Sequence, residues 1–156
     1  MPASFAQSDS ELLAECRLEH FRGPGPGGQK RNKTSNAVRL THLPTSVSVT
    51  AVETRSQKQN LAAALKRLRR RLVLEQRRRP TDPSAFIRHG RWSATSLEAL
   101  AVLLDHLADA QWSVSDTAAR LGVSTASIAK AVTRDGETLT VVNRERERCG
   151  WKPLSP

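Results

Sequence analysis

The segment from residue 37 to residue 72 constrains the fold most, because two alternating apolar stretches lead directly into a leucine stripe at helical spacing. Residues 37–42 and 47–53 alternate apolar and polar side chains, are rich in β-branched residues, and are separated by a proline. This pattern predicts an antiparallel pair of strands. The leucines at positions 61, 65, 68 and 72 fall on one face of a helix, and Ser56 is suited to cap its start. The sequence therefore predicts an α+β fold, in which a small antiparallel sheet packs on a long basic helix.

The residues before this pair give a weaker signal. Residues 1–11 are mostly small and polar and are expected to form a flexible N-terminus. Between Leu12 and Phe21 the pattern suits either a strand or a short helix, and we favour the strand. Residues 22–33, with the sequence RGPGPGGQKRNK, contain four glycines and two prolines and are expected to form a loop.

The second half of the chain is expected to be helical. Pro80 and Pro83 break the long helix, so residues 80–92 are predicted to be a linker. Beyond it, apolar residues recur at helical spacing, and a helix capped by Ser115 or Asp116 is followed by Gly122 and a further helix, as in a helix-turn-helix. The predicted organisation is a flexible N-terminus (1–11), a first domain (12–79), a linker (80–92) and a small all-helical domain with a helix-turn-helix-like pair (93–156).

Charge is unevenly distributed along the chain, whose formal net charge is +10 at pH 7. Residues 17–79 hold 16 Lys and Arg against 3 Asp and Glu, whereas residues 80–156 hold 9 of each. The first half is therefore expected to attract a polyanion, and nucleic acid is favoured over anionic membrane because only 4% of the residues are aromatic. No apolar run approaches the roughly 20 residues that cross a bilayer. Because residues 1–16 also resemble neither a secretory signal nor a transit peptide, a cytoplasmic protein without a membrane partner is expected.

The loop at residues 22–33 carries a motif. Its glycines suggest a phosphate-binding P-loop, but that motif needs Lys and then Ser or Thr after the last glycine, whereas Gln29 and Lys30 follow Gly28. Three signatures then occur in order: GGQ at residues 27–29, NKT and AVRLTHLPT in residues 32–45, and RSQ, N and AL in the helix up to residue 72. Together they resemble the catalytic domain of class I peptide chain release factors and their short ribosome-rescue relatives. The sequence departs from the family pattern at Arg31, Ser46 and Leu61, and Ser46, where glycine is usual, implies a different hairpin geometry.

The resemblance implies that Gly27, Gly28 and Gln29 enter the peptidyl-transferase centre and promote attack of water on the ester of peptidyl-tRNA. Glycine has no Cβ and adopts a positive φ readily, so the backbone can approach RNA and the ester closely. The backbone N–H of Gln29 can donate to the developing oxyanion, and its neutral side-chain amide can orient water. The resemblance also implies N-methylation of the Gln29 side chain.

Basic residues around the loop and on the helix are expected to contact RNA phosphates, because residues 58–74 contain no acid and a merely solvated face usually mixes charges. These candidates are Arg22, Lys30, Arg31, Lys33, Arg39, Lys58, Lys66, Arg67, Arg69, Arg70 and Arg71. Such contacts position a protein without selecting a base sequence, so binding should weaken steeply with salt. The expected partners are the ribosome, through large-subunit rRNA at the peptidyl-transferase centre, and peptidyl-tRNA.

No metal, cofactor or side-chain general base is indicated. Cys16 and Cys149 are widely separated and form no C-x-x-C motif, so neither a zinc site nor a disulfide framework is expected. His20 and His42 are candidates for a general base, but a histidine in a strand pattern is more often packed or at the surface.

Codon-independent rescue of stalled ribosomes is favoured over stop-codon reading, because a decoding factor needs a further folded module for which this chain has too few residues. The rescue relatives carry a basic, mostly unstructured tail, whereas residues 80–156 are neutral and helical, so the way a stalled ribosome is sensed stays open. Two alternatives remain: a non-catalytic ribosome- or RNA-binding protein, and a helix-turn-helix DNA-binding regulator. DNA binding is disfavoured because residues 124–134 offer only Lys130 and Arg134 as cations.

Overall fold

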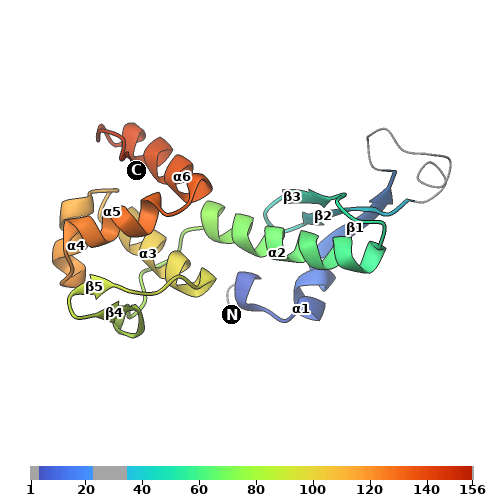
Figure 1. The fold of residues 1–156 in the computed structure, drawn as a ribbon, viewed down its shortest axis with the longest axis horizontal. Helices are drawn as coiled ribbons and strands as arrows, with labels where there is room; N and C mark the ends of the chain where they lie inside the picture. The colour runs from blue at the N-terminus through green and yellow to red at the C-terminus, as the bar shows by residue number, and fades with distance from the viewer. Residues whose placement is uncertain (1–3, 23–34, 156) are drawn as a thin grey trace. The chain divides into compact units, whose positions relative to one another are not determined.

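The chain contains both helices and a small antiparallel sheet, and it divides into two compact units, Met1–Leu72 and Val73–Pro156 (Figure 1). The computed structural model describes residues 4–22 and 35–155. The boundary between the units falls within a single helix, α2, which spans Gln57–Glu75. Each unit is described below by itself.

The first unit contains a three-stranded antiparallel sheet in the order β1-β2-β3. Strand β1 spans Cys16–Phe21, β2 spans Ala37–His42 and β3 spans Val47–Ala51. The predicted strand pair is confirmed, although β3 ends at Ala51 and not at residue 53. The strand favoured between Leu12 and Phe21 is confirmed only for Cys16–Phe21, because residues 12–14 belong to a helix that spans Asp9–Ala14. Buried and exposed residues alternate along β3, which explains why its strand pattern is legible in the sequence.

Helix α2 packs its apolar stripe on the sheet. Ser56 caps the helix as predicted, because its Oγ accepts from the backbone N of Gln59 at 3.3 Å. Three leucines of the stripe, at positions 65, 68 and 72, are buried in one cluster with Val38 and Leu40 of β2, and Leu61 is half-buried beside them. Burying a leucine side chain stabilises a fold by roughly 1.5–3 kcal/mol, so this cluster holds the sheet to the helix.

The N-terminal residues are more ordered than the sequence predicts. A 3-10 turn, η1, spans Ser4–Ala6 and helix α1 spans Asp9–Ala14, where a flexible terminus over residues 1–11 was expected. Ser8 and Glu11 form a reciprocal capping box, and Leu12 is fully buried in the core of the unit. The prediction of a flexible terminus is wrong for the residues of these two elements. The capping box and the burial of Leu12 stabilise a helix, although most residues of this segment are small and polar.

The turn between β2 and β3 contains Ser46 in the left-handed region, with φ +58°. Glycine adopts this conformation without steric cost, whereas another residue pays on the order of 1 kcal/mol. The serine therefore adopts, at an energetic cost, a backbone conformation that glycine adopts freely.

The second unit combines a short hairpin with helices. The elements are η2 at Ser84–Phe86, β4 at Ile87–Arg88, β5 at Arg91–Trp92, α3 at Leu97–Asp109, α4 at Val114–Leu121, α5 at Thr125–Thr133 and α6 at Gly136–Arg148. Helices α4 and α5 form the predicted helix-turn-helix-like pair, with Gly122 at φ +63° in the turn. The first of these helices is capped by Ser113, and not by the predicted Ser115 or Asp116, since Ser113 Oγ accepts from the backbone N of Asp116.

Residues 80–92, predicted to be a linker, instead belong to the second unit. They contain the β4–β5 hairpin, whose turn residues His89 and Gly90 have φ of +50° and +67°. Positive φ at both central residues is the geometry that joins short antiparallel strands tightly. Trp92 is buried and its ring lies 5.8 Å from that of Phe86. Helix α2 already ends at Glu75, and the stretch that holds the two prolines lies within the second unit.

Candidate functional site

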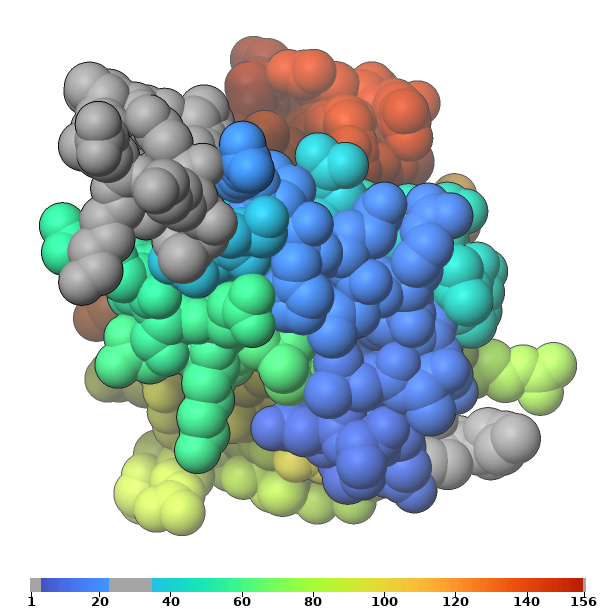
Figure 2. Space-filling model, turned by 90° about the vertical axis from the view of Figure 1, so that its right-hand side faces the viewer, coloured from blue at the N-terminus to red at the C-terminus, as the bar shows by residue number. Residues whose placement is uncertain are grey.

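The strands that flank the GGQ segment meet at one end of the sheet. Phe21, the last residue of β1, pairs with Ala37, the first residue of β2. Strands β1 and β2 and the start of α2, coloured blue, cyan and green, form much of the surface of the first unit that faces the viewer in Figure 2. The predicted residues Gly27, Gly28, Gln29, Lys30, Arg31 and Lys33 lie outside the described residues, in the chain between these two strands.

Two side-chain amides of α2 hold the chain where it enters β2. Gln57 Nε2 donates to the carbonyl oxygen of Ser35 at 2.8 Å, and Asn60 Nδ2 donates to that of Asn36 at 2.7 Å. Both amides come from the RSQ and N positions of the helix signature. This part of the signature therefore anchors the chain that leads out of the GGQ segment.

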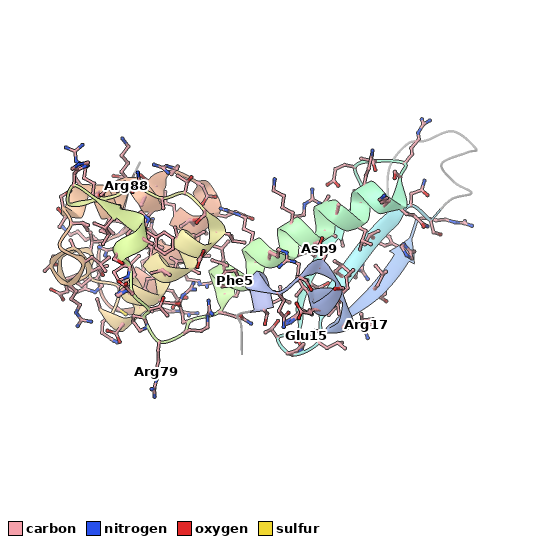
Figure 3. The ribbon with its side chains drawn as sticks, turned by 90° about the horizontal axis from the view of Figure 1, so that it is seen from below. Phe5, Asp9, Glu15, Arg17, Arg79 and Arg88 are labelled. Atoms are coloured by element: carbon pink, nitrogen blue, oxygen red, sulfur yellow. The ribbon has the colours of Figure 1, made fainter. Side chains whose placement is uncertain are left out.

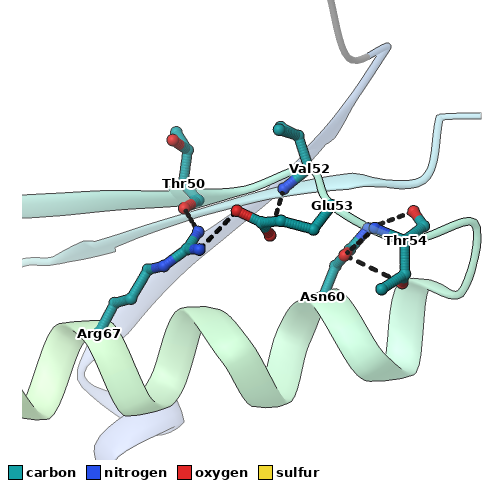
Figure 4. A network of polar contacts seen from close by, with 6 residues as sticks. All are labelled: Thr50, Val52, Glu53, Thr54, Asn60 and Arg67. Carbon is teal, nitrogen blue, oxygen red and sulfur yellow. Dashed lines mark hydrogen bonds and ion pairs between the residues drawn. The ribbon is translucent and has the colours of Figure 1, made fainter.

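Asn60 is fully buried and uses all four of its hydrogen-bonding positions. Besides its bond to Asn36, Nδ2 donates to the carbonyl oxygen of Thr54 at 2.9 Å, while Oδ1 accepts from the backbone N of Thr54 at 3.0 Å and from its hydroxyl at 3.1 Å (Figure 4). An amide side chain has two donors and two acceptor lone pairs, so every position is satisfied. Aspartate would lack the donors and an apolar residue would lack both, so this site requires asparagine. Reasoning from the sequence did not single out Asn60, whose only signal was its place in the helix signature.

Arg67, predicted to contact RNA, is held within the first unit. Its guanidinium donates to the carbonyl oxygen of Thr50 and to the carboxylate of Glu53 (Figure 4). The hydrogen bond from Arg67 lowers the pKa of Glu53 below its ordinary value. This arginine joins α2 to the end of β3, and its predicted contact with RNA stays a prediction.

Arg69 is a second predicted RNA contact with internal partners. It donates to the carbonyl oxygen of Phe5 and to the carboxylate of Asp9, each at 2.7 Å, and its side chain is only 19% exposed. Phe5 and Asp9 both lie on the N-terminal segment (Figure 3). Arg69 therefore ties that segment to α2, which a charge pattern cannot reveal because its partners are distant in the sequence.

The other predicted RNA contacts that the structure describes lie at or near the surface. Arg22, Arg39, Lys58, Lys66 and Arg71 are exposed, and Arg70 is half-buried. Arg39 projects from β2 with its guanidinium 5.2 Å from the centre of the Phe21 ring. Arg22 follows Phe21 and Lys58 follows Gln57 in the chain, so these two and Arg39 place three exposed cations close to the ends of the GGQ segment.

Comparison with known proteins identifies the family. The model of the RF-1 domain matches residues 13–98, which is more than half of the chain. The chain belongs to the RF-1 domain family. The match covers the sheet, α2 and the β4–β5 hairpin, and it ends at the start of α3.

Several proteins that are similar to part of this chain are named peptide chain release factors. Peptide chain release factor 1 of Rickettsia rickettsii (strain Sheila Smith) is 42% identical over 77 residues, which are 49% of this chain and 22% of the relative. Peptide chain release factor 2 of Pseudarthrobacter chlorophenolicus is 53% identical over 60 residues, covering 38% of this chain and 16% of the relative. Peptide chain release factor 1 of Acidiphilium cryptum is 52% identical over 64 residues, covering 41% and 18%. The chain thus spans about a fifth of the length of these relatives.

Neither histidine of the RF-1 domain sheet is placed as a general base. His42 is fully buried, with Nδ1 2.7 Å from Thr45 Oγ1 and Nε2 3.0 Å from Glu15 Oε2. Hydrogen bonds from Gln7 and with His42 lower the pKa of Glu15 below its ordinary value. His42 therefore joins the hairpin turn to the end of α1, while His20 is exposed on β1. His42 is thus packed and His20 lies at the surface, which are the two placements usual for a histidine in a strand pattern.

The described residues were also compared with the requirements of a metal site and of a membrane-spanning helix. In residues 4–22 and 35–155 no three His, Cys, Asp or Glu side chains are grouped so as to hold a metal ion. Cys16 and Cys149 are free thiols, and burial raises the pKa of Cys16. No helix in the same part of the chain is long and apolar enough to cross a membrane.

Proposed function

We propose that this chain hydrolyses the ester of peptidyl-tRNA on the ribosome, and that it does so without reading a codon, as a rescue factor for stalled ribosomes. The observation that carries the proposal is the RF-1 domain match over residues 13–98, because the Gly27-Gly28-Gln29 triplet falls inside it. The relatives that match at 42–53% identity are named release factors, and release of a peptide from tRNA requires cleavage of this ester. Codon independence is the finer part of the proposal and needs its own test.

The three loop residues supply the chemistry. Gly27 and Gly28 let the backbone approach the ester and rRNA where a Cβ would collide. The backbone N–H of Gln29 donates to the oxyanion that develops as water attacks, and its side-chain amide orients that water. Loss of one oxyanion donor typically slows a reaction about 100- to 1000-fold. His42 is buried and hydrogen-bonded to Thr45 and Glu15, which favours this electrostatic mechanism over a side-chain general base.

The clamp formed by Gln57 and Asn60 supports the proposal because it fixes the point at which the catalytic segment returns to the sheet. Positioning matters greatly in such a reaction, since a displacement of about 1 Å can cost on the order of 100-fold in rate. A loop anchored at β1 on one side and by two amides on the other satisfies this need.

Affinity for the ribosome comes from the surrounding cations. Arg22, Arg39 and Lys58 lie near the ends of the loop segment, and Lys30, Arg31 and Lys33 lie within it. These residues contact phosphates of large-subunit rRNA at the peptidyl-transferase centre, in the cytoplasm. We also propose that the side chain of Gln29 is N-methylated.

The test is a release assay with the purified chain and ribosomes that carry labelled peptidyl-tRNA. Three complexes are compared, with an empty A site, a sense codon or a stop codon. We expect release with the empty A site and no advantage from a stop codon. Gln29→Ala keeps the backbone N–H but loses the side-chain amide that orients water, so it should bind the ribosome and release peptide on the order of 100-fold more slowly. The exposed Gln59→Ala on α2 serves as the matched control.

Two results would contradict the proposal at different levels. If the wild-type chain binds stalled ribosomes and frees no peptide, it is a non-catalytic RNA-binding protein. If release requires a stop codon, the chain is a termination factor and the rescue assignment is wrong.

A further inference from the structure

A groove in the second unit lies between strand β5 and helix α5. It has a volume of about 290 Å³ and is lined by Arg91 and Trp92 on one side and by Ser124, Ser127, Lys130 and Arg134 on the other. The backbone N of Trp92 donates to Ser127 Oγ at 2.7 Å, which fixes the strand to the helix. The hairpin turn lies beside the helix-turn-helix turn, since a Cβ on Gly90 would be 3.7 Å from the carbonyl oxygen of Gly122. Contacts within the second unit therefore hold the two sides of the groove together.

The groove is positively charged. Arg91, Lys130 and Arg134 line it, and none of its lining residues is acidic. Arg88 pairs with Arg91 across the hairpin and is exposed (Figure 3). Among the residues that the structure describes, these four cations have no acidic partner. Because the hairpin lies in the stretch that the sequence suggested was a linker, Arg91 was not counted with the cations of α5.

Other arginines of the second unit differ, because acids or carbonyl groups of the same unit engage them. Arg120 pairs with Asp109 at 2.6 Å, and Arg144 and Arg148 both pair with Glu145. Arg146 is buried and donates to the carbonyl oxygen of Trp112 at 2.6 Å. The equal numbers of acids and bases in residues 80–156 therefore conceal a local positive surface at the groove.

We propose that this groove binds the phosphate backbone of a folded RNA. Arginine and lysine side chains without acidic partners match the repeated negative charge of a polynucleotide. The remaining lining residues of α5 are serine and alanine, and no Asn, Gln or acidic side chain lines the groove. Arginine and lysine can also bond guanine edges, but the major groove of an RNA helix is too deep and narrow for side chains to read, so the contact is made to phosphates and is independent of base sequence. The choice of RNA over DNA rests on the proposed ribosomal function.

The experiment uses the full chain and a fluorescein-labelled RNA stem-loop, with binding followed by anisotropy over a series of KCl concentrations. The groove variant is Arg91→Gln/Lys130→Gln/Arg134→Gln. The matched control is Arg120→Gln/Arg144→Gln/Arg148→Gln, which removes the same charge from the same unit at side chains that are 52%, 54% and 68% exposed. Because all three tryptophans of the chain, Trp92, Trp112 and Trp151, lie in this unit, their fluorescence on thermal unfolding checks that both variants fold.

We expect the groove variant to bind the stem-loop about tenfold more weakly or worse near physiological salt, and to reduce the slope of log K against log salt by roughly 2–3. The control should change the affinity much less. Equal losses in the two variants would overturn the proposal, because affinity would then follow net charge alone. Tighter binding of a DNA duplex of the same sequence, lost in the groove variant, would also overturn it and make the groove a DNA site.

The RNA-binding experiment and the release assay can fail independently of each other. If the wild-type chain releases no peptide and the groove variant binds RNA more weakly than the control variant, the proposed function is refuted and the groove is supported. A chain that releases peptide normally while the groove variant binds the stem-loop as tightly as the control would support the function and refute the groove.

Discussion

Replacing Asn60 by alanine should destabilise the first unit strongly. The fully buried amide makes four hydrogen bonds, three with Thr54 and one with Asn36. Each neutral hydrogen bond contributes about 0.5–1.5 kcal/mol net, so four amount to roughly 2–6 kcal/mol. Thr54 is exposed and water can replace part of what it loses. We therefore expect Asn60→Ala to lower the free energy of unfolding of this unit by about 2–4 kcal/mol.

Native-state hydrogen exchange is the suitable assay, because every tryptophan of the chain lies in the second unit and fluorescence does not report on the first. The most protected amides of β2 and β3 should exchange about 30- to 1000-fold faster in Asn60→Ala, which is the expected loss converted at 1.36 kcal/mol per tenfold. Tryptophan fluorescence on unfolding should stay unchanged.

Gln57→Ala is the graded control for this prediction. Gln57 is exposed and makes one hydrogen bond to the same stretch of chain, so its loss should cost at most about 1 kcal/mol. If exchange in Asn60→Ala stays within about threefold of wild type, which corresponds to less than 1 kcal/mol, the amide does not hold the end of the loop and the reasoning from its four bonds is refuted.

Three further perturbations test other contacts of the first unit. Ser46→Gly should stabilise it by about 0.5–1 kcal/mol by removing the cost of a left-handed serine, seen as a higher urea midpoint in far-UV circular dichroism; a lower midpoint would contradict this. The pKa of Glu15 is lowered from 4.5 by Gln7 and His42, so its contribution to stability is present above that value and is lost as pH falls through the lowered pKa. The stability difference between wild type and Glu15→Gln should therefore shrink below pH 4.5, and a difference that does not vary with pH would refute the contact. Arg69→Ala should lower stability by about 1–2 kcal/mol, because one of its partners is exposed, and should leave RNA affinity within about threefold; a large loss of affinity at unchanged stability would instead support Arg69 as an RNA contact.

Periodicity predicted the sheet and α2 because each of these elements has one buried face. In β3 the valines at positions 47 and 49 and Ala51 are buried, while the residues between them are exposed. The same alternation of apolar and polar residues is present in the sequence, so the strand could be predicted from it. The α4–α5 pair was predicted for a related reason. A left-handed glycine at position 122 and a capping serine at position 124 are local signals that need no knowledge of the rest of the fold.

The missed features depend on contacts between distant residues or on elements too short to show a period. The strands of the β4–β5 hairpin contain two residues each, so the only local signal was the His89-Gly90 turn. Helix α6 was not predicted as a separate element, although Asp135 caps it. The bonds of Asn60 to Asn36 and of Arg69 to Asp9 join residues that lie 24 and 60 positions apart, and no local pattern contains this information.

The partners of the cations change how the charge of the chain relates to RNA binding. The run of bases on α2 suggested one continuous RNA surface, but Arg67 and Arg69 hold the first unit together. Residues 80–156 suggested a neutral unit, but acids such as Glu145 pair with arginines away from the groove and leave Arg91 and Lys130 without acidic partners among the described residues. A cation already paired with an acid releases fewer counterions from RNA than an unpaired one, because its field is partly compensated before binding. The groove variant and its control have the same net charge but should therefore differ in the slope of log K for RNA against log salt. The change in this slope, and not the net charge of a segment, measures the number of phosphate contacts.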